Sequence, residues 1–334
     1  MTNRYTQWNQ VMKMFKTICV SELKSIGLQP YDLFIAFCGF EKRCLSIIKN
    51  IPSEAIDRGI VFINNEAPAE SVENLEQFKD VLRDKADIKH INIFNPIEVA
   101  DSIIEVISKN CEGIDSPRLL VDITSFTHEA LLIFLAIAKR VLKNVYIEYV
   151  YCNAAVYASE LEDTAEQWLS RGIKEVRSVL GYAGDLKPSQ ETVLIMMVGY
   201  ECERAWQVID SISPEELIIT YNDASGSTDQ TNGDANQHHA ELLRDLAAYY
   251  QNPKQYIIPS NNPFETANKL EKVISTISAD TNIIIAPMNN KLATIGAGIV
   301  ALKKTEIQIC YAPAIYYNTS SYSVEGDVCY LFSL

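Results

Sequence analysis

An internal repeat constrains the fold of this chain of 334 residues more than any other feature of its sequence. The stretch Phe37-Cys38-Gly39-Phe40-Glu41-Lys42-Arg43 has a close counterpart in Val198-Gly199-Tyr200-Glu201-Cys202-Glu203-Arg204. Three further pairs follow in the same order: 95–98 with 262–265, 118–122 with 282–286, and 151–157 with 311–317. Four matching pairs in one order predict a duplicated chain with two homologous halves.

Apolar strand-like runs alternate with helix-like runs in both halves, and the connections between them are short. The expected strands are 33–38, 60–64, 88–93, 118–123 and 145–151, then 193–198, 216–221, 255–259, 282–286 and 306–312. The expected helices are about 40–50, 70–84, 96–110 and 127–143, then 201–212, 236–251, 263–279 and 290–304. These runs are almost continuously apolar, which is typical of parallel strands buried between two helical layers. We therefore predict an α/β fold with two tandem homologous Rossmann-like domains, each a mostly parallel five-stranded sheet with helices on both faces.

The repeat also sets the expected domain boundaries. We predict an N-terminal amphipathic helix within residues 1–30, a first domain at 31–157, a connector at 158–190 that begins with a helix, and a second domain at 191–334. The N-terminal helix is inferred from apolar residues spaced three and four apart between Trp8 and Leu23. Residues 222–237 contain almost no apolar side chain, so we expect a mobile surface loop, either a lid or an insertion without a role.

The composition excludes several classes of protein. A net charge of −14 argues against unspecific binding to nucleic acid or to an anionic membrane, since both require a basic surface. No apolar run reaches the roughly 20 residues that span a bilayer, and the N-terminus does not resemble a signal peptide. The eight cysteines are scattered without a CxxC pair, which favours reduced thiols in the cytoplasm and no metal site.

The repeated turn after the first strand of each half is a candidate anion site. A helix start attracts anions through its free N–H groups, and Arg43 or Arg204 could grip a phosphate or carboxylate. Glu41 and Glu201 could accept hydrogen bonds from ribose or base. The alternative is a helix-start carboxylate paired with a nearby arginine. Neither turn is a GxGxxG or Walker A loop, so we identify no cofactor and expect a nucleotide-like ligand instead.

The turn after the fourth strand carries a second set of polar residues. In the first half these are Asp122, Thr124, Ser125 and His128, and in the second half Asn289, Asn290 and Lys291. We predict one site from Glu41, Arg43, Asp122, Thr124 and Ser125, and another from Glu201, Arg204, Asn289, Asn290 and Lys291. Helix capping by Ser125 or Thr127 and a solvated Lys291 are the alternatives. Tyr151, Tyr157, Tyr311, Tyr316 and Tyr317 follow the fifth strands, where they could stack on a purine or pack together.

The run Leu119-Leu120-Val121-Asp122-Ile123-Thr124-Ser125-Phe126-Thr127-His128 resembles the strand–turn–helix signature of CARF domains, which are Rossmann-like sensors of CRISPR-associated and related antiviral proteins. Phe126 and His128 stand where that family usually has glycine and lysine. The resemblance implies a cyclic oligonucleotide as ligand, bound in a crevice shared by two domains. Two halves of one chain could pair across such a crevice.

Together these features favour a cytoplasmic sensor or binding scaffold for a nucleotide-like ligand, in a prokaryotic antiviral defence system and with a protein partner or a second copy of the chain. Two alternatives remain. One is an enzyme that cleaves a glycosidic or phosphodiester bond of a nucleotide, with Glu41, Asp122 or His128 as the catalytic candidates. The other is a non-catalytic structural subunit that uses its N-terminal helix and acidic surface.

Overall fold

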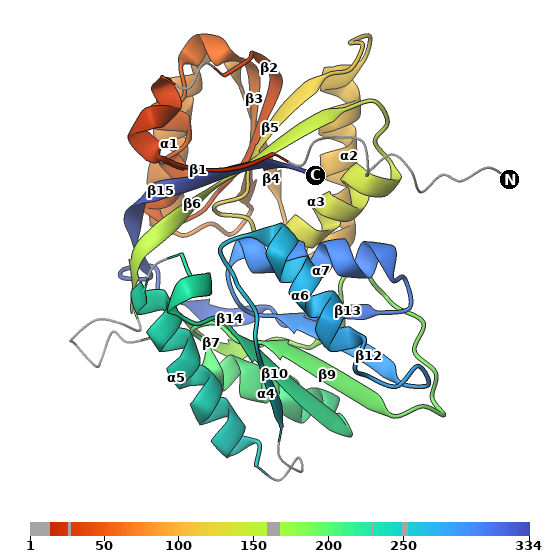
Figure 1. The fold of residues 1–334 in the computed structure, drawn as a ribbon. Helices are drawn as coiled ribbons and strands as arrows, with labels where there is room; N and C mark the ends of the chain where they lie inside the picture. The colour runs from red at the N-terminus through yellow and green to blue at the C-terminus, as the bar shows by residue number, and fades with distance from the viewer. Residues whose placement is uncertain (1–13, 26–27, 159–167, 229, 249–252) are drawn as a thin grey trace, which may run out of the picture.

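Two parallel-rich sheets, one from each half of the chain, form the molecule (Figure 1). The computed structural model describes residues 14–25, 28–158, 168–228, 230–248 and 253–334. Five parallel strands form the centre of the first sheet: β2 (Tyr31–Cys38), β3 (Ile56–Asn64), β4 (Ala86–Ile91), β5 (Arg118–Asp122) and β6 (Tyr146–Tyr157). Their spatial order is β4-β3-β2-β5-β6, which is a Rossmann-like arrangement.

The second sheet repeats this order. Its parallel strands are β9 (Thr192–Met197), β10 (Glu216–Tyr221), β11 (Lys254–Ile257), β12 (Asn282–Pro287) and β13 (Gln308–Tyr311), arranged as β11-β10-β9-β12-β13. The predicted fold class is therefore confirmed. We call residues 31–157 the first half and residues 192–317 the second half.

Helices cover both faces of each sheet. They are α1 (Ala69–Leu82), α2 (Pro96–Cys111) and α3 (His128–Arg140) in the first half, and α4 (Cys202–Ile212), α5 (Gln230–Leu246), α6 (Pro263–Ile274) and α7 (Lys291–Lys303) in the second. The helix expected at 40–50 is instead a pair of short 3₁₀ turns, η3 (Lys42–Leu45) and η4 (Ile48–Asn50).

The two halves exchange their sixth strands. The strands β7 (Ser170–Ile173) and β8 (Arg177–Ser178) follow the first half in sequence but pair antiparallel with β14 (Ala314–Tyr317) and β13 of the second half. Conversely, β15 (Ser323–Ser333) follows the second half and pairs antiparallel with β6 of the first. In Figure 1, β15 therefore lies in the sheet of the first half, far from its neighbours in sequence.

This exchange corrects the predicted boundaries. Residues 323–333 belong to the first sheet and not to a domain at 191–334, and the connector contributes β8 to the second sheet and β7 to a separate two-stranded sheet with β14. The predicted N-terminal helix is wrong where the structure describes it: β1 (Phe15–Cys19) is a strand paired with β15, followed by the 3₁₀ helix η2 (Val20–Lys24). Residues 1–13 fall outside the described residues. So does most of the connector helix predicted from residue 160. Only its end at 168–172 is described, and this end includes the first residues of the strand β7.

A single apolar core runs through the contact between the halves. It includes buried residues of α2 and α3 together with those of α6 and α7, so the halves are not independent domains. A Cβ on Gly298 of α7 would lie 2.6 Å from Leu135 of α3, too close for an ordinary contact. The Gly296-Ala297-Gly298 stretch thus serves close helix packing.

The segment 222–237 is more structured than predicted. A 3₁₀ helix, η8 (Ala224–Gly226), follows β10, and α5 begins at Gln230. Asn222 is fully buried and its amide accepts from Asn289 and donates to Ser227. Amide and hydroxyl side chains of this segment thus fix the turn beside the carboxyl edge of the sheet.

Helices of the described ranges are all too short or too polar to cross a lipid bilayer. All eight cysteines are free thiols. Within the described part of the chain, no three His, Cys, Asp or Glu side chains lie close enough to share a metal ion.

Candidate functional site

Glu41 and Arg43 form a buried ion pair at the end of β2. Arg43 donates from Nε and Nη2 to the two carboxylate oxygens of Glu41, at 2.7 and 3.1 Å, and from Nη1 to the carbonyl of Cys152 at 3.1 Å. Ser323, on the exchanged strand β15, donates its hydroxyl to Glu41. Burial alone raises the pKa of Glu41, but the Arg43 guanidinium and the Ser323 hydroxyl outweigh it, so the pKa is lowered and the carboxylate stays charged.

The second half contains the counterpart of this arrangement. Arg204 donates to Glu201 at 2.6 Å and to the carbonyl of Ala312 at 3.0 Å, and Ser170 of the exchanged strand β7 donates to Glu201. In the repeat, Arg204 stands one position further from its glutamate than Arg43 does. The two guanidinium groups nevertheless reach the equivalent carbonyls of Cys152 and Ala312. The structural alternative to ligand binding, a carboxylate paired with a nearby arginine, is thus realised in both turns.

Aromatic contacts relate the halves by an approximate two-fold axis. Tyr200 of the second half packs on Tyr157 of the first, with ring centroids 4.6 Å apart. Reciprocally, Phe40 of the first half packs on Tyr317 of the second at 5.9 Å. Phe40 is the repeat counterpart of Tyr200, and Tyr157 that of Tyr317. Such reciprocal contacts are the signature of a two-fold interface.

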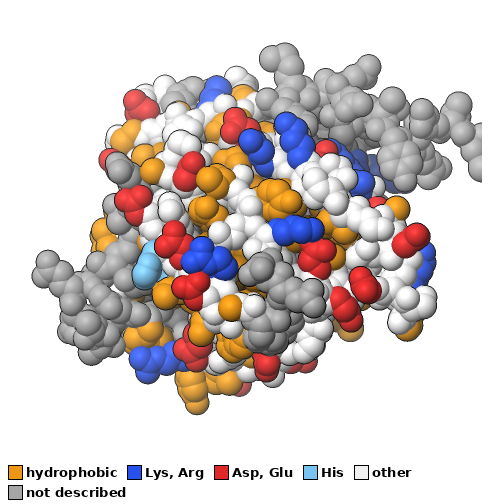
Figure 2. Space-filling view, turned by 60° about the horizontal axis from the view of Figure 1, so that its bottom comes forward, with side chains coloured by type: hydrophobic (Ala, Val, Ile, Leu, Met, Phe, Trp, Pro, Cys, Tyr) orange, Lys and Arg blue, Asp and Glu red, His pale blue; other side chains and the backbone are white. Residues whose placement is uncertain are grey.

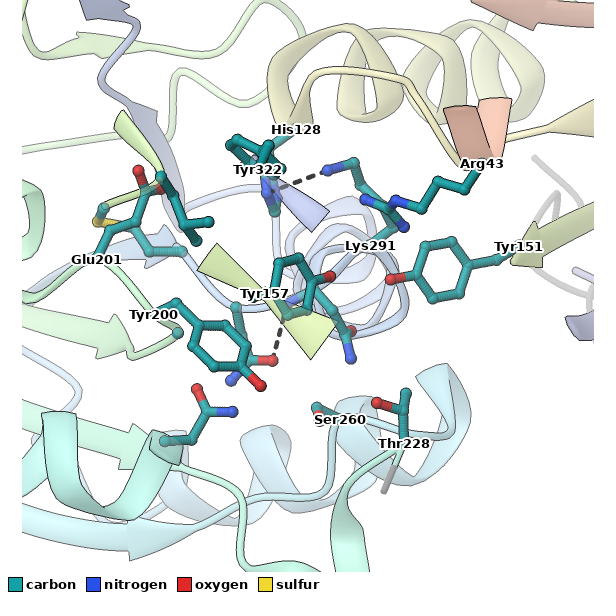
Figure 3. Close-up of a pocket in the computed structure, with 16 residues that line it drawn as sticks. Arg43, His128, Tyr151, Tyr157, Tyr200, Glu201, Thr228, Ser260, Lys291 and Tyr322 are labelled. Atoms are coloured by element: carbon teal, nitrogen blue, oxygen red, sulfur yellow. Dashed lines mark hydrogen bonds between the residues drawn. The ribbon is translucent and has the colours of Figure 1, made fainter. Parts of the chain in front are cut away.

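A polar cavity of about 50 Å³ lies where the two halves meet (Figure 3). Its walls come from the strand ends of the second half and, opposite them, from side chains of the first. The lining residues are Arg43, His128, Tyr151 and Tyr157 of the first half, Gly199, Tyr200, Glu201, Thr228, Asn236, Ser260 and 288–291 of the second, and Leu169 and Tyr322 beside the exchanged strands. The two sites that the sequence predicted as separate thus contribute to one cavity.

Lys291 is the exceptional charge of this cavity. It begins α7, directly opposite His128, which begins α3, and its Nζ lies 3.4 Å from His128 Nε2. No carboxylate of the described residues lies within ion-pair distance of Lys291, whereas Arg43 and Arg204 each hold a glutamate. Lys291 is therefore an uncompensated positive charge in a partly closed site, which favours an anionic ligand.

The environment shifts the pKa of both facing side chains. Burial lowers the pKa of Lys291 to about 8, with the nearby Arg43 as a further cause. Burial also lowers the pKa of His128 well below its usual value, helped by Lys291 and Arg204. Near neutral pH, His128 is therefore uncharged and Lys291 is mostly charged, although it loses its proton readily.

Five predicted site residues do not line this cavity: Glu41 and Arg204 of the two ion pairs, and Asp122, Thr124 and Ser125. Thr124 accepts a hydrogen bond from the Cys152 amide, and Asp122 accepts one from the Thr124 amide. Both are buried beneath the turn. Ser125 lies against Gly39, 3.3 Å from where a Cβ would stand. The observed contacts of Asp122, Thr124 and Ser125 support the turn. Burial raises the pKa of Asp122 to about 7.

The remaining predicted residues divide by role. Asn290 caps α7 by accepting from the Ala293 amide, while Asn289 binds the carbonyl of Val198 and the amide of Asn222. Arg204 lines a smaller cavity of about 20 Å³ that shares His128 and Glu201 with the main one. Thr127, the capping alternative, accepts from the Ala130 amide. Arg43 and Lys291 thus remain as the cationic side chains that line the main cavity.

The equivalent turn of the first half is filled by the protein itself. Asn74 of α1 donates to the carbonyls of Gly39 and Phe40, at 2.9 and 3.2 Å. The Phe40 ring packs on Tyr317 and also on Tyr322 at 5.4 Å. The duplicated fold is therefore used asymmetrically, because the open space lies over the strand ends of the second half.

Several lining residues were not predicted from the sequence. Tyr200 was read only as part of the repeated turn, and Tyr322, Thr228, Asn236 and Ser260 were not singled out. The position of 222–237 after the second strand was the available signal for Thr228 and Asn236. Of the five predicted tyrosines, Tyr151 and Tyr157 line the cavity, whereas the side chain of Tyr316 is exposed.

The outer surface offers no comparable concentration of positive charge on the face shown in Figure 2, where acidic and basic side chains are interspersed. This agrees with the net charge of −14. The unpaired cation of interest thus lies inside the molecule, in the cavity.

No protein-family model matches this chain, and no curated protein matches it by sequence. Among solved structures, the cytoplasmic domain of a prokaryotic cation chloride cotransporter is 11% identical over 87% of this chain and 99% of that one, with a TM-score of 0.25. A short chain dehydrogenase from Mycobacterium smegmatis is 11% identical over 85% and 92%, with a TM-score of 0.22. The NADP-bound N-domain of a bacterial malonyl-CoA reductase is 8% identical over 83% and 80%, with a TM-score of 0.23. These scores are too low to carry an argument, so the fold class rests on the order of strands described above.

Proposed function

We propose that this protein is a sensor or binding scaffold that holds one nucleotide-like anion in the cavity between its halves. The observation that carries the proposal is Lys291, a cation without a carboxylate partner among the described residues, in the same cavity as Arg43. Three hydrogen bonds occupy Arg43, and a guanidinium has five N–H groups, so two remain for a ligand. Tyr157 and Tyr200 supply ring faces suited to a base.

The present cavity is small for a whole nucleotide, since sites for such ligands commonly enclose hundreds of Å³. Binding therefore requires the lining to open. An opening between the halves would move the exchanged strands, because Ser170 and Ser323 contact the two glutamates. Ligand occupancy could be passed by this route to a protein partner or to a second copy of the chain. A cytoplasmic role in prokaryotic antiviral defence, with a cyclic oligonucleotide as ligand, is the specific form that the CARF resemblance suggests.

Bond cleavage finds less support in the geometry. Glu41 is held by Arg43 with a lowered pKa, so it is a poor proton donor near neutral pH. Asp122 is absent from the cavity lining. Of the three catalytic candidates, only His128 faces the space where a ligand would lie.

A thermal-shift panel tests the proposal. The panel contains inorganic phosphate, nucleoside monophosphates and cyclic di- and oligonucleotides, because a ligand that binds only the folded chain raises its melting temperature. We expect at least one compound to stabilise the wild type and to lose its effect in Lys291→Ala. Lys303→Ala is the matched control, since Lys303 lies on the same helix, exposed and paired with Glu271. Equal shifts in both variants would refute the site, and no shift with any anion would refute the function.

A further inference from the structure

The contacts of His128 fix which of its ring nitrogens carries the proton. Thr294 donates its hydroxyl to the carbonyl of Asn290 at 3.0 Å, so its oxygen is left to accept from His128 Nδ1 at 2.5 Å. The proton therefore lies on Nδ1, and the lone pair of Nε2 faces the Nζ of Lys291. A neutral imidazole with this tautomer is a proton acceptor for the lysine.

The contacts from Thr294 through His128 to Lys291 have the arrangement of an activated nucleophile. An amine lies beside a base, and a third group orients the base, which is the arrangement by which proteins activate weak nucleophiles. Two helix N-termini converge on Lys291, and both disfavour its protonated form. The other charges that face it are Arg43, Arg204, Glu41 and Glu201, and both glutamates are neutralised by their arginines.

We propose that Lys291 captures a small carbonyl compound as an imine, with His128 as the base and Arg43 as the anchor for an anionic group on the same compound. A two- or three-carbon oxo acid matches these features, because it joins a reactive carbonyl to a carboxylate. The cavity of about 50 Å³ has room for a few water-sized groups, so a ligand of this size is far better matched to the present lining than a nucleotide.

The chemical step is balanced by the residues present. The Lys291 ammonium gives a proton to His128 Nε2, and the neutral amine adds to the carbonyl carbon. The carbonyl oxygen takes up the proton that the added nitrogen releases and becomes the hydroxyl of a carbinolamine. Loss of that hydroxyl as water, protonated by His128, leaves the carbon–nitrogen double bond. The net change is amine plus carbonyl to imine plus water, without an oxidant or a cofactor.

Reductive trapping tests this inference with the full-length wild-type chain. The chain is incubated with glyoxylate and cyanoborohydride near pH 7, and peptide mass spectrometry then locates the reduced adducts. We expect Lys291 to be modified about 100-fold faster than Lys303 of the same helix, which is the scale of acceleration that a positioned base supplies. Equal modification of Lys291 and Lys303 would overturn the inference, and this comparison needs no variant.

Two variants separate the dyad from simple anion binding. Lys291→Arg keeps the charge but should form no adduct at position 291. His128→Asn should lower the rate of trapping at Lys291 by about 100-fold near pH 7, with recovery at higher pH where hydroxide deprotonates the amine. An unchanged rate and pH profile in His128→Asn would overturn the role of the histidine. The inference shares the cavity with the proposed function but does not depend on a nucleotide: failed trapping with an intact, Lys291-dependent thermal shift would remove this inference alone.

Discussion

At the scale of single residues, the two Glu–Arg pairs differ from surface ion pairs because they are buried. The side chains of Arg43 and Glu41 are 3% and 12% exposed, whereas those of Lys79 and Glu76 are 45% and 63% exposed. A buried charge that loses its partner is costly because neither water nor a counter-charge replaces it. The glutamates thus make the arginines necessary for folding, independently of any ligand.

Replacement of Arg43 by alanine should therefore destabilise the chain strongly. We expect a loss of about 3–5 kcal/mol in the free energy of unfolding, because Glu41 is left buried and unpaired. The matched change Lys79→Ala removes an exposed pair and should cost about 0–1 kcal/mol. Urea denaturation measures both. Similar costs for the two variants would show that the Glu41–Arg43 pair is solvated in the folded protein.

Asp122 gives the protein a distinctive dependence on pH. Its folded-state pKa is raised to about 7, and its Oδ2 has no hydrogen-bond partner among the described residues. The folded chain therefore keeps a proton that the unfolded chain releases near pH 4, and stability falls as the pH rises from about 4 to about 7. Asp122→Asn cannot titrate, so its stability should fall less over this window, by roughly 4 kcal/mol at most. Parallel stability curves in urea denaturation for the variant and the wild type would contradict this prediction.

At the scale of elements, the repeated turns differ in how closely two backbones approach. A Cβ on Gly199 would lie 2.2 Å from the carbonyl oxygen of Met288, which is a backbone atom that cannot turn aside. A Cβ on Gly39 would lie 3.3 Å from the Cβ of Ser125. Both halves thus have a glycine where the first strand passes the turn after the fourth strand. The contact between this glycine and the turn is tighter in the second half.

This difference predicts unequal effects of the same substitution. Gly199→Ala should destabilise the chain by about 3 kcal/mol or more and should distort the cavity, since the two turns that line it must separate. Gly39→Ala should cost about 1 kcal/mol, because Ser125 needs to shift by only a few tenths of an ångström. Melting temperatures of the two variants give the comparison. A larger loss for Gly39→Ala would mean that the turns are packed differently.

The sequence predicted the strands and helices best where the local apolar pattern and the internal repeat agreed. The five parallel strands and the helices α1 to α4, α6 and α7 fall close to their predicted positions because buried strands and amphipathic helices carry their periodicity locally. At 42–50 the helix prediction is wrong, since the chain forms two short 3₁₀ turns there. Phe15 to Cys19 fit a helical spacing too, but their partner is β15 at the other end of the chain. Such non-local pairing leaves no local signal.

At the scale of the whole molecule, the two halves exchange strands: β15 pairs with the first half, whereas β7 and β8 pair with the second. In the first sheet β15 lies between β1 and β6, and in the second sheet β8 is the edge strand beside β13. The helices α3 and α7 share one apolar core. Neither half can complete its own sheet. The sequence indicates the repeat, but the merging of two predicted sites into one cavity follows from this exchange and from the approximate two-fold contact.

The chain should consequently unfold as one unit. We expect a single calorimetric transition, with a van't Hoff enthalpy close to the calorimetric enthalpy, although the two halves repeat one order of parallel strands. The reason is that melting either half removes the edge strands and the core of the other. Two resolved transitions, or a first half expressed as residues 28–158 that folds alone, would contradict this picture.

The central claim is that one anion site exists per chain, at Lys291 and Arg43. Anomalous diffraction from crystals soaked in tungstate, an oxyanion shaped like phosphate, tests it most directly. We expect one tungstate in the cavity between the halves, within contact of Lys291 and Arg43, and none at the filled turn around Gly39 and Asn74. A tungstate at the Gly39 turn, or an empty cavity in crystals that bind tungstate elsewhere, would contradict it.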